Sequence, residues 1–262
     1  MSEPAEPPAL EVCDLAFRHR SATDGALVIE SVSFSVPRGS ICVIAGPNGA
    51  GKSTLLRLIA GLLQPERGTV RIGGREPSHA RIGYAWQSTA QSLFPWLSGI
   101  ENAALPLRLK GVPRSEREEK VRALCAELEF DLPLERPPYE MSGGEQQKLC
   151  VVRALASDCE LLLLDEPTAS LSYESSVEVF DYLQRIPARR GIAVVIVTHS
   201  PDLAVLAADR VLPVRGTPLR IRPDDLQSIA GAPAHPRPLD WMHTAEFASH
   251  VRAVREQMSA LP

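Results

Sequence analysis

The chain has 262 residues, 44% of them hydrophobic, which is enough for a sizeable core in one large domain or in a core with an appendage. The formal net charge of −4 argues against a dedicated nucleic-acid binder, which usually carries a basic face, so we expect no nucleic-acid partner. The opening stretch MSEPAEPPAL has no basic and no apolar region and does not predict a secretory signal. The five cysteines lack CxxC spacing and are predicted to be reduced packing residues: Cys13, Cys42, Cys125, Cys150 and Cys159.

Strands and helices are predicted to alternate along most of the chain. Residues 1–9 are Pro-rich and are predicted to be disordered. VSFSV (32–36) alternates as a half-buried strand does, and the apolar run ICVIAG (41–46) indicates a buried strand. The stretch STLLRLIAGLL, from Ser53, has helical periodicity.

The middle of the chain has a different character. The segment from about 87 to 138 contains loops and then SEREEKVRALCAELEF, with apolar residues at helical spacing. LLLLDE and IAVVIVTH are predicted strands, with a helix near 175–185 between them. Together these elements predict an α/β fold, with a mostly parallel sheet, an N-terminal antiparallel portion and a helical subdomain inserted at about 88–155.

The last part of the chain begins with a predicted linker. APAHPRPLDW (232–241) is Pro-rich and precedes a helix whose apolar stripe is Phe247, Val251, Val254, Met258 and Leu261. Packing of this helix on the body is the simpler interpretation, and a separate binding element is the alternative. We therefore predict a main domain at 10–218 and a C-terminal extension at 219–262.

GPNGAGKST (46–54) matches the pattern G-x-x-x-x-G-K-[ST] between a predicted strand and a predicted helix. Glycines let such a loop wrap phosphates and point backbone N–H groups at them. Lys52 would reach the β- and γ-phosphates, and the Ser53 hydroxyl would bind Mg²⁺. The sequence therefore predicts a nucleoside triphosphate site.

LLLLDEPT (161–168) places two carboxylates at the end of a buried strand. Asp165 is predicted to hold Mg²⁺, and Glu166 to polarise a water against the γ-phosphate as a general base or a positioning group. On its own the pair could be a strand terminus, but beside a phosphate loop it indicates catalysis.

MSGGEQQK (141–148) predicts a second anion site, because Ser142, Gly143 and Gly144 precede a polar helix. A helix capped by Ser142 is the alternative, but this explains the serine and not the two glycines.

The motifs GPNGAGKST, SGGEQQK, LLLLDEPT and VTHS, in this order, resemble those of the ATP-binding subunit of an ABC transporter, over about residues 10–214. In that family the SGG segment contacts the ATP held by the opposite subunit, so two ATP molecules lie in a head-to-tail dimer. The resemblance implies ATP and Mg²⁺ as ligands. The nucleotide contacts that it implies are Gly46, Asn48, Gly49, Gly51, Lys52, Ser53 and Thr54, with Ser142, Gly143 and Gly144 acting across the dimer.

Three further roles come from the resemblance alone. Phe17 would stack on adenine, Gln87 would contact Mg²⁺ or water and sense the membrane subunit, and His199 would contact the γ-phosphate and align Glu166. Three positions depart from the family pattern: Met141 for Leu, Lys148 for Arg, which loses the planar fork, and Ser172 for Asp. The last departure puts cooperation between the two ATP sites in doubt.

The segment after Gln87 suggests what the ATPase drives. Phe94, Pro95, Trp96 and Leu97 are predicted to form an apolar socket for a permease, or else to anchor a buried loop. FPWLSGIEN and the C-terminal EFASHVRAVREQM resemble importers of nitrate, sulfonate and taurine. In contrast, ENAALPLRLKGVPRSERE resembles ATPases of lipoprotein release or macrolide export, and THSPDLAVLAADR lacks the Glu-Ala usual in importers.

We therefore expect a homodimer that powers import through transmembrane permease subunits, with a solute-binding protein, at the cytoplasmic side of the inner membrane. The alternatives are an export-type ATPase, a soluble ABC ATPase acting on DNA or ribosomes, and a regulatory ATP-binding module with feeble hydrolysis.

Overall fold

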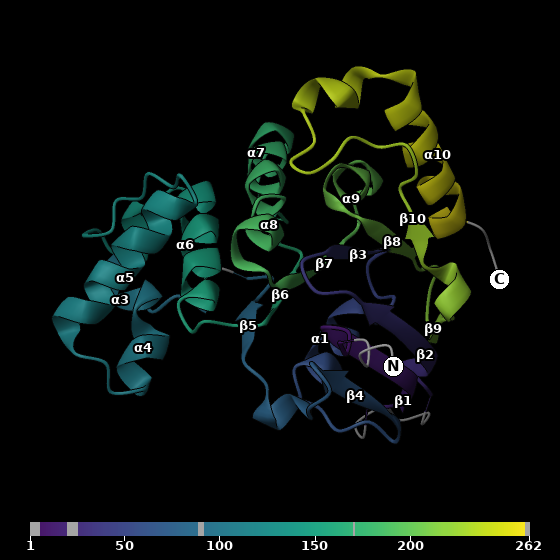
Figure 1. Ribbon diagram of the computed structural model, residues 1–262, viewed down its shortest axis with the longest axis horizontal. Coiled ribbons are helices and arrows are strands. Elements are labelled where there is room, and N and C mark those ends of the chain that lie inside the picture. The colour runs from purple at the N-terminus through teal and green to yellow at the C-terminus, as the bar shows by residue number, and fades with distance from the viewer. Residues whose placement is uncertain (1–5, 20–25, 89–91, 170, 260–262) are drawn as a thin grey trace, which may run out of the picture.

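The computed structural model describes residues 6–19, 26–88, 92–169 and 171–259 (Figure 1). The strands are β1 (Leu10–Phe17), β2 (Ile29–Val36), β3 (Ile41–Ala45), β4 (Arg67–Ile72), β5 (Ile82–Ala85), β6 (Leu161–Asp165), β7 (Ala193–Thr198), β8 (Arg210–Pro213), β9 (Leu219–Ile221) and β10 (Gln227–Ser228). The α-helices are α1 (Lys52–Ile59), α3 (Gly99–Ala103), α4 (Leu105–Leu109), α5 (Arg114–Glu127), α6 (Gly143–Leu155), α7 (Tyr173–Leu183), α8 (Ile186–Arg190), α9 (Pro201–Ala207) and α10 (Ala245–Ser259). Short 3₁₀ helices are η1 (Pro77–His79), η2 (Pro138–Glu140), η3 (Pro223–Asp225) and η4 (Leu239–His243).

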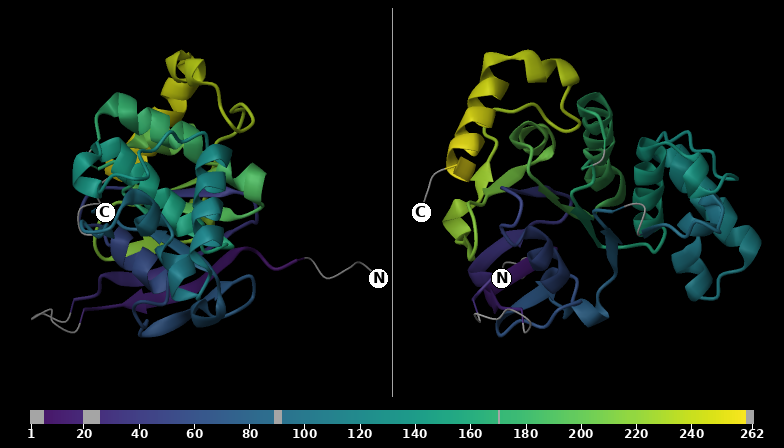
Figure 2. Two further views of the ribbon diagram at one scale, coloured as in Figure 1. Left: turned by 90° about the vertical axis from the view of Figure 1, so that its left-hand side faces the viewer. Right: turned by 180° about the vertical axis from the view of Figure 1, so that it is seen from behind.

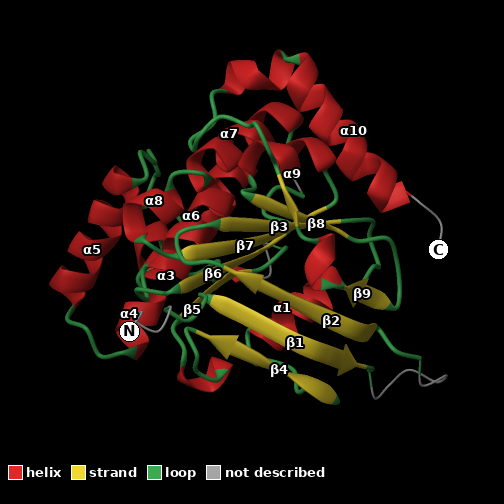
Figure 3. Cartoon of the chain, turned by 45° about the vertical axis from the view of Figure 1, so that its right-hand side comes forward, coloured by secondary structure: helices red, strands yellow, loops and turns green. Residues whose placement is uncertain are grey.

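The strands form two sheets, which Figure 3 shows one in front of the other. A six-stranded sheet has the order β10-β8-β3-β7-β6-β5 and is parallel except for β10, which pairs antiparallel with β8. A four-stranded sheet has the order β4-β1-β2-β9, with β1 antiparallel to both β2 and β4. The predicted mostly parallel sheet with an N-terminal antiparallel portion is therefore confirmed.

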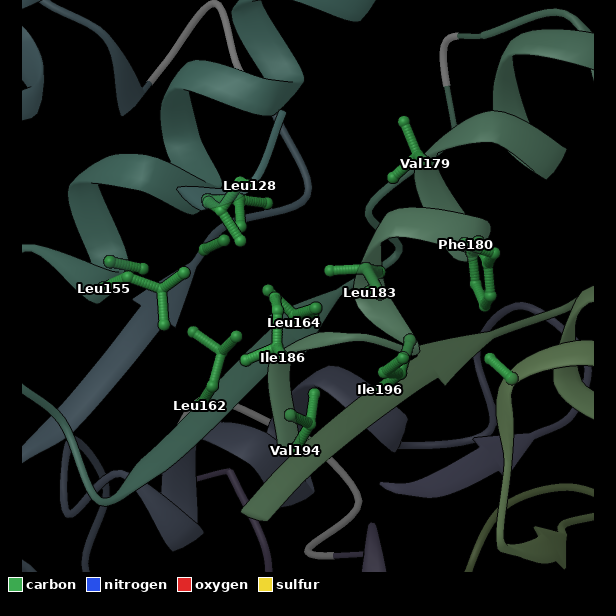
Figure 4. Close-up of a cluster of buried hydrophobic side chains, with 14 of the residues drawn as sticks. Leu128, Leu155, Leu162, Leu164, Val179, Phe180, Leu183, Ile186, Val194 and Ile196 are labelled. Carbon is green, nitrogen blue, oxygen red and sulfur yellow. The ribbon is translucent and has the colours of Figure 1, made fainter. Parts of the chain in front are cut away.

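The alternation of side chains along the parallel strands divides the interior into two cores. Leu162 and Leu164 of β6 face one side of the sheet, and Leu161 and Leu163 face the other. On the first side these leucines pack with Phe180, Leu183 and other residues of the covering helices (Figure 4). On the second side the buried residues of α1 fill the space between the two sheets. Strands covered on both faces explain the continuous apolar runs in the sequence.

Helices α3 to α6 gather beyond β5, and α10 lies on the other side of the molecule, against α9 and β8 (Figures 1 and 2). Phe247, Val251 and Val254 of the predicted stripe are buried there and Met258 packs against the same core, while Leu261 lies outside the described residues. This agrees with the simpler interpretation, a helix packed on the body. Among the described residues, no helix has the length and apolar character needed to cross a membrane.

Two predicted boundaries need correction. Residues 6–9 belong to the described chain, and Ala9 is buried with its carbonyl accepting a hydrogen bond from the N–H of Gly73. Residues 219–228, assigned to an extension, instead supply β9 and β10 to the two sheets. Strands of two or three residues are too short to show a period in the sequence. The division into domains otherwise stays a prediction.

Candidate active site

The loop between β3 and α1 has the backbone that a phosphate cradle needs. Gly49 and Gly51 have φ values of 80° and 88°, in the left-handed region that favours glycine. Gly46 is required for space, because a Cβ there would lie 2.3 Å from the side chain of Val214. Lys52 starts α1, and its Nζ donates to the carbonyl oxygens of Gly46 (2.8 Å) and Pro47 (2.9 Å). The loop is thus curled around its own lysine.

A cavity of about 580 Å³ opens above this loop. The predicted site residues that line it are Asn48, Gly49, Gly51, Lys52, Ser53, Thr54, Gln87 and Glu166. Three other lining residues were not predicted, namely His19, Val28 and Thr217. The Thr217 hydroxyl donates to the Gly49 carbonyl at 2.7 Å, so it supports the loop from a segment far along the chain. No motif in the sequence indicates this contact.

Asp165 and Ser53 meet at the base of the cradle. The Ser53 hydroxyl donates to Oδ1 of Asp165 at 2.8 Å, and the carboxylate is buried. Burial raises the pKa of Asp165, although hydrogen bonds from Ser53 and Tyr84 oppose this effect. Hydroxyl and carboxylate oxygens suit Mg²⁺, which usually takes one or two carboxylates plus phosphate oxygens and water. Among the described residues no cluster of three His, Cys, Asp or Glu side chains could hold a metal by itself.

Glu166 stands between Lys52 and His199. Its Oε2 accepts a hydrogen bond from Nδ1 of His199 at 2.8 Å, because an ionised carboxylate cannot donate. Its Oε1 lies 3.3 Å from Nζ of Lys52, and both of these side chains are 5% exposed. Glu166 also has φ 48°, an uncommon value outside glycine that often marks functional sites. Its N–H donates to the Val197 carbonyl of β7, which fixes the backbone in place.

The prediction for Phe17 is not supported by its position. Phe17 is buried in the core beneath the four-stranded sheet and does not line the cavity. His19, two residues further along, lines the cavity and meets the Phe17 ring edge-on at 5.0 Å between ring centroids. The prediction chose the last residue of the strand, whereas the ring that reaches the cavity follows the strand end.

Ser142, Gly143 and Gly144 do not line this cavity. Ser142 caps α6, accepting from the N–H of Glu145, whose carboxylate accepts in return from the N–H of Ser142. Capping of α6 therefore explains the serine by contacts within its own chain. Neither glycine has a positive φ. A Cβ on Gly143 would lie 3.4 Å from the side chain of Leu171, whereas a Cβ on Gly144 would meet nothing within 4 Å among the described residues.

The structure shows the contacts of the three residues that depart from the family pattern. Ser172 caps α7 by accepting from the N–H of Ser175 at 3.2 Å, so it keeps the capping ability that aspartate would have. The Lys148 ammonium lies over the rings of Phe130 and Tyr182, 5.7 and 5.1 Å from their centroids. Met141 is buried in the larger core.

A groove of about 750 Å³ lies beside the cradle, between β5 and helices α4 and α6. Gln87 lines both the groove and the cavity, and Trp86 and Leu109 are exposed in the groove wall. The rings of Phe94 and Trp96 contact each other at a tilt of 59°, with centroids 5.3 Å apart. Neither residue lines the groove, and Trp96 is 75% exposed.

The exposed loop at Phe94 and Trp96 is held by a buried residue that the sequence did not predict as functional. Asn102 is fully buried, and its side chain accepts from the N–H of Phe94 and donates to the carbonyls of Phe94, Leu97 and Ser98. A single asparagine in a short helix gives no signal of this role.

Comparisons with known proteins agree with this geometry. The protein family model described as ABC transporter matches residues 29–169, just over half of the chain. The ABC transporter ATP-binding protein YtrE of Bacillus subtilis is 38% identical over 188 residues, covering 68% of this chain and 80% of YtrE. The lipoprotein-releasing system ATP-binding protein LolD of Geobacter metallireducens is 36% identical over 207 residues, covering 74% and 91% of the two chains. The taurine import ATP-binding protein TauB of Chromobacterium violaceum is 35% identical over 193 residues, covering 74% of each.

Solved structures show the same fold. A dimeric bacterial ABC transporter cassette is 26% identical with a TM-score of 0.69, covering 78% of this chain and 93% of that one. The cbiO1 subunit of Clostridium perfringens is 25% identical with a TM-score of 0.70, covering 79% and 84%. The chain therefore belongs to the ABC transporter family, as an ATP-binding subunit that hydrolyses ATP.

Proposed function

We propose that two copies of this chain close on two ATP molecules, each lying between the cradle of one copy and the Ser142–Gly144 segment of the other. The observation that carries this proposal is the pair of sites within one chain, one built as a cavity and one exposed at a helix N-terminus. A Cβ on Gly144 would meet no atom within 4 Å in the described part of the chain, so the space beside this residue is open there. Phosphate oxygens of a second copy's nucleotide would fit this space, because backbone N–H groups at a helix start favour anions.

Each residue around the cavity has a separate proposed role in ATP hydrolysis. Lys52 and the loop N–H groups bind the phosphates, and Glu166 orients the attacking water or takes its proton. His199, donating to Glu166 from Nδ1, holds that carboxylate in one orientation. Ser53, Asp165 and Gln87 would hold Mg²⁺, which neutralises charge on the phosphates.

Transport is the proposed use of this hydrolysis. The groove that shares Gln87 with the cavity suits an apolar segment of a permease, because exposed Trp86 and Leu109 stand in its wall. Closure of the dimer on ATP would then change the groove through Gln87, and tighter ATP binding in the closed state would supply the work. Such a subunit would sit at the cytoplasmic side of the inner membrane.

Import of nitrate, sulfonate, taurine or a similar small solute is the proposed direction. The similarity to the taurine importer TauB supports it, together with the FPWLSGIEN segment and the C-terminal helix α10. Import would require a solute-binding protein, so ATPase activity of the assembled transporter should rise when that protein is added with its solute.

An export-type or lipoprotein-release role is the second candidate. It is favoured by the similarity to LolD, which extends over 91% of that protein, and by the segment ENAALPLRLKGVPRSERE. A transporter that reaches full ATPase activity without any solute-binding protein would support this candidate over import.

The hydrolytic site is tested by two substitutions. Glu166→Gln should bind ATP normally but lower turnover by about 10²- to 10⁴-fold, the usual contribution of a general base. Lys52→Ala removes a charge-assisted contact and should weaken ATP binding by about 10- to 100-fold. Nucleotide binding by calorimetry and phosphate release under single-turnover conditions would separate the two effects. Near-normal turnover in Glu166→Gln would contradict the assigned role.

A further inference from the structure

Tyr84 touches the carboxylate of Asp165 from outside the cradle. It lies on β5, which runs parallel to β6, the strand that ends at Asp165. The Tyr84 hydroxyl is 3.3 Å from Oδ2 of Asp165, while the Ser53 hydroxyl is 2.8 Å from Oδ1. Each carboxylate oxygen therefore has its own donor, one from α1 and one from β5. Two donors on opposite oxygens fix the rotation of a carboxylate, as outer partners do for metal ligands.

The direction of this hydrogen bond follows from the chemistry of its two groups. A phenol hydroxyl can donate and an ionised carboxylate can only accept, so Tyr84 is the donor and Asp165 the acceptor.

The ring of Tyr84 also belongs to the groove. It packs against Trp86 with ring centroids 4.3 Å apart, and the Arg57 guanidinium lies over the Trp86 ring at 5.8 Å. Arg57 is four residues after Ser53 on α1, so both side chains lie on one face of that helix. Asp165 itself borders the groove. Tyr84 is thus shared between the groove and the buried carboxylate.

We propose that Tyr84 is a positioning residue, which orients Asp165 for the divalent cation and carries changes in the groove to that carboxylate. This inference rests on the proposed magnesium role of Asp165. Gln87 borders the same groove but is an exposed side chain, whereas Tyr84 is joined to Asp165 by a hydrogen bond. Packing of Tyr84 against Trp86 gives the groove a direct mechanical contact with the cation site.

The first test measures how strongly Mg²⁺ tightens binding of a fluorescent, non-hydrolysable ATP analogue, as the ratio of its dissociation constants in EDTA and in Mg²⁺. Tyr84→Phe should lower this ratio about tenfold, since loss of an outer partner costs about 10- to 100-fold in metal affinity. Its affinity for the analogue in EDTA should not change. Tyr182→Phe, which alters a tyrosine packed on Phe130 away from the cradle, should leave both values unchanged.

Asp165→Asn is the reference variant and should lose most of the Mg²⁺ effect. If Asp165→Asn lowers the ratio and Tyr84→Phe does not, the role of Tyr84 is wrong while the proposed function stands. If Asp165→Asn also has no effect, the proposed magnesium role of Asp165 is wrong, and the role inferred for Tyr84 is then wrong as well. Equal thermal unfolding midpoints for Tyr84→Phe and Tyr182→Phe exclude general loosening as the cause.

The second test asks whether the groove acts through Tyr84. Trp86→Ala should lower the Mg²⁺ ratio at least about twofold in the native background, as coupled neighbouring residues do in double-mutant cycles. In the Tyr84→Phe background the same substitution should have no further effect. An equal loss in both backgrounds would overturn the proposed link between the groove and the cation site.

Discussion

At the scale of single residues, the site depends on which side chain reaches the cavity rather than on which lies in a motif. His19 lines the cavity, while Phe17 is buried in the core. An imidazole ring can stack on a nucleobase as other aromatic rings do. We therefore assign the adenine contact to His19 as a proposal in place of Phe17.

Substitution of the two residues should separate a ligand contact from a core position. His19→Ala should weaken ATP binding about two- to tenfold, the value of one aromatic stacking contact, without lowering stability. His19→Tyr should retain the affinity. Phe17→Leu should instead lower the free energy of unfolding while ATP affinity per folded molecule stays unchanged. An ATP affinity that depends on Phe17 and not on His19 would restore the original prediction.

The five cysteines have contrasting surroundings, since Cys13 is exposed and the other four are buried. Burial raises the pKa of Cys42 to about 12 and of Cys125 and Cys159 to about 11, from an ordinary value of 9.0. At pH 8 a thiol reagent should therefore modify one thiol quickly and the rest only in urea, and Cys13→Ser should abolish the fast phase.

The buried thiols also make stability depend on pH. Between pH 9 and about 11 the unfolded chain would lose thiol protons that the folded chain keeps. Their contribution to stability is therefore complete below pH 9 and is lost as the pH rises through this window. More than one fast thiol at pH 8 would show that the core opens more readily than the structure indicates.

At the scale of elements, Arg237 fastens the C-terminal segment to α9. Its guanidinium donates to the carbonyls of Val205 and Leu206 at the end of α9, at 2.6 and 3.2 Å, and lies over the Trp241 ring. Its own N–H donates to the side chain of Gln184. Burial lowers the pKa of Arg237 to about 10, so it is still charged at neutral pH. A cation at a helix C-terminus satisfies carbonyls that have no partner within the helix.

Loss of this cap should lower the free energy of unfolding. Arg237→Met leaves buried carbonyls without a donor and should lower the free energy of unfolding by about 1–3 kcal/mol in urea denaturation. Arg252→Met, on the exposed face of α10, is the matched control and should stay within about 0.5 kcal/mol of the native value. Equal stability of the two variants would mean that the C-terminal segment is not fastened by Arg237.

The elements also show which features can be predicted from sequence. Long apolar runs such as LLLLDE and IAVVIVTH indicated β6 and β7 correctly, because strands covered on both faces are apolar throughout. The phosphate loop could be predicted because its glycines and lysine lie within one short motif of the sequence. Thr217, Tyr84 and Asn102 were missed, because each acts through one contact that only the folded chain creates. β9 was not predicted either, because its pairing partner β2 lies far away in the sequence. β10 was not predicted because it has only two residues, too few to show a period.

At the scale of the whole molecule, the central question is why one chain carries two anion sites that do not meet. The first is a cavity lined by the charged pair Lys52 and Glu166. The second is a capped helix start with open space beside Gly144 in the described part of the chain. Closure of two copies would bring the second site of each to the first site of the other. Ser172, which caps α7, is compatible with closure because it leaves that helix start intact.

The most direct test is the mass in solution of the Glu166→Gln protein, measured by light scattering with and without ATP. Slow hydrolysis in this variant should let the ATP-bound state accumulate, so we predict a dimer with ATP and a monomer without it. Ser142→Arg in the same background should bind ATP and stay monomeric, because a bulky cation replaces the serine at the second site. A Glu166→Gln protein that binds ATP and remains monomeric would contradict the account.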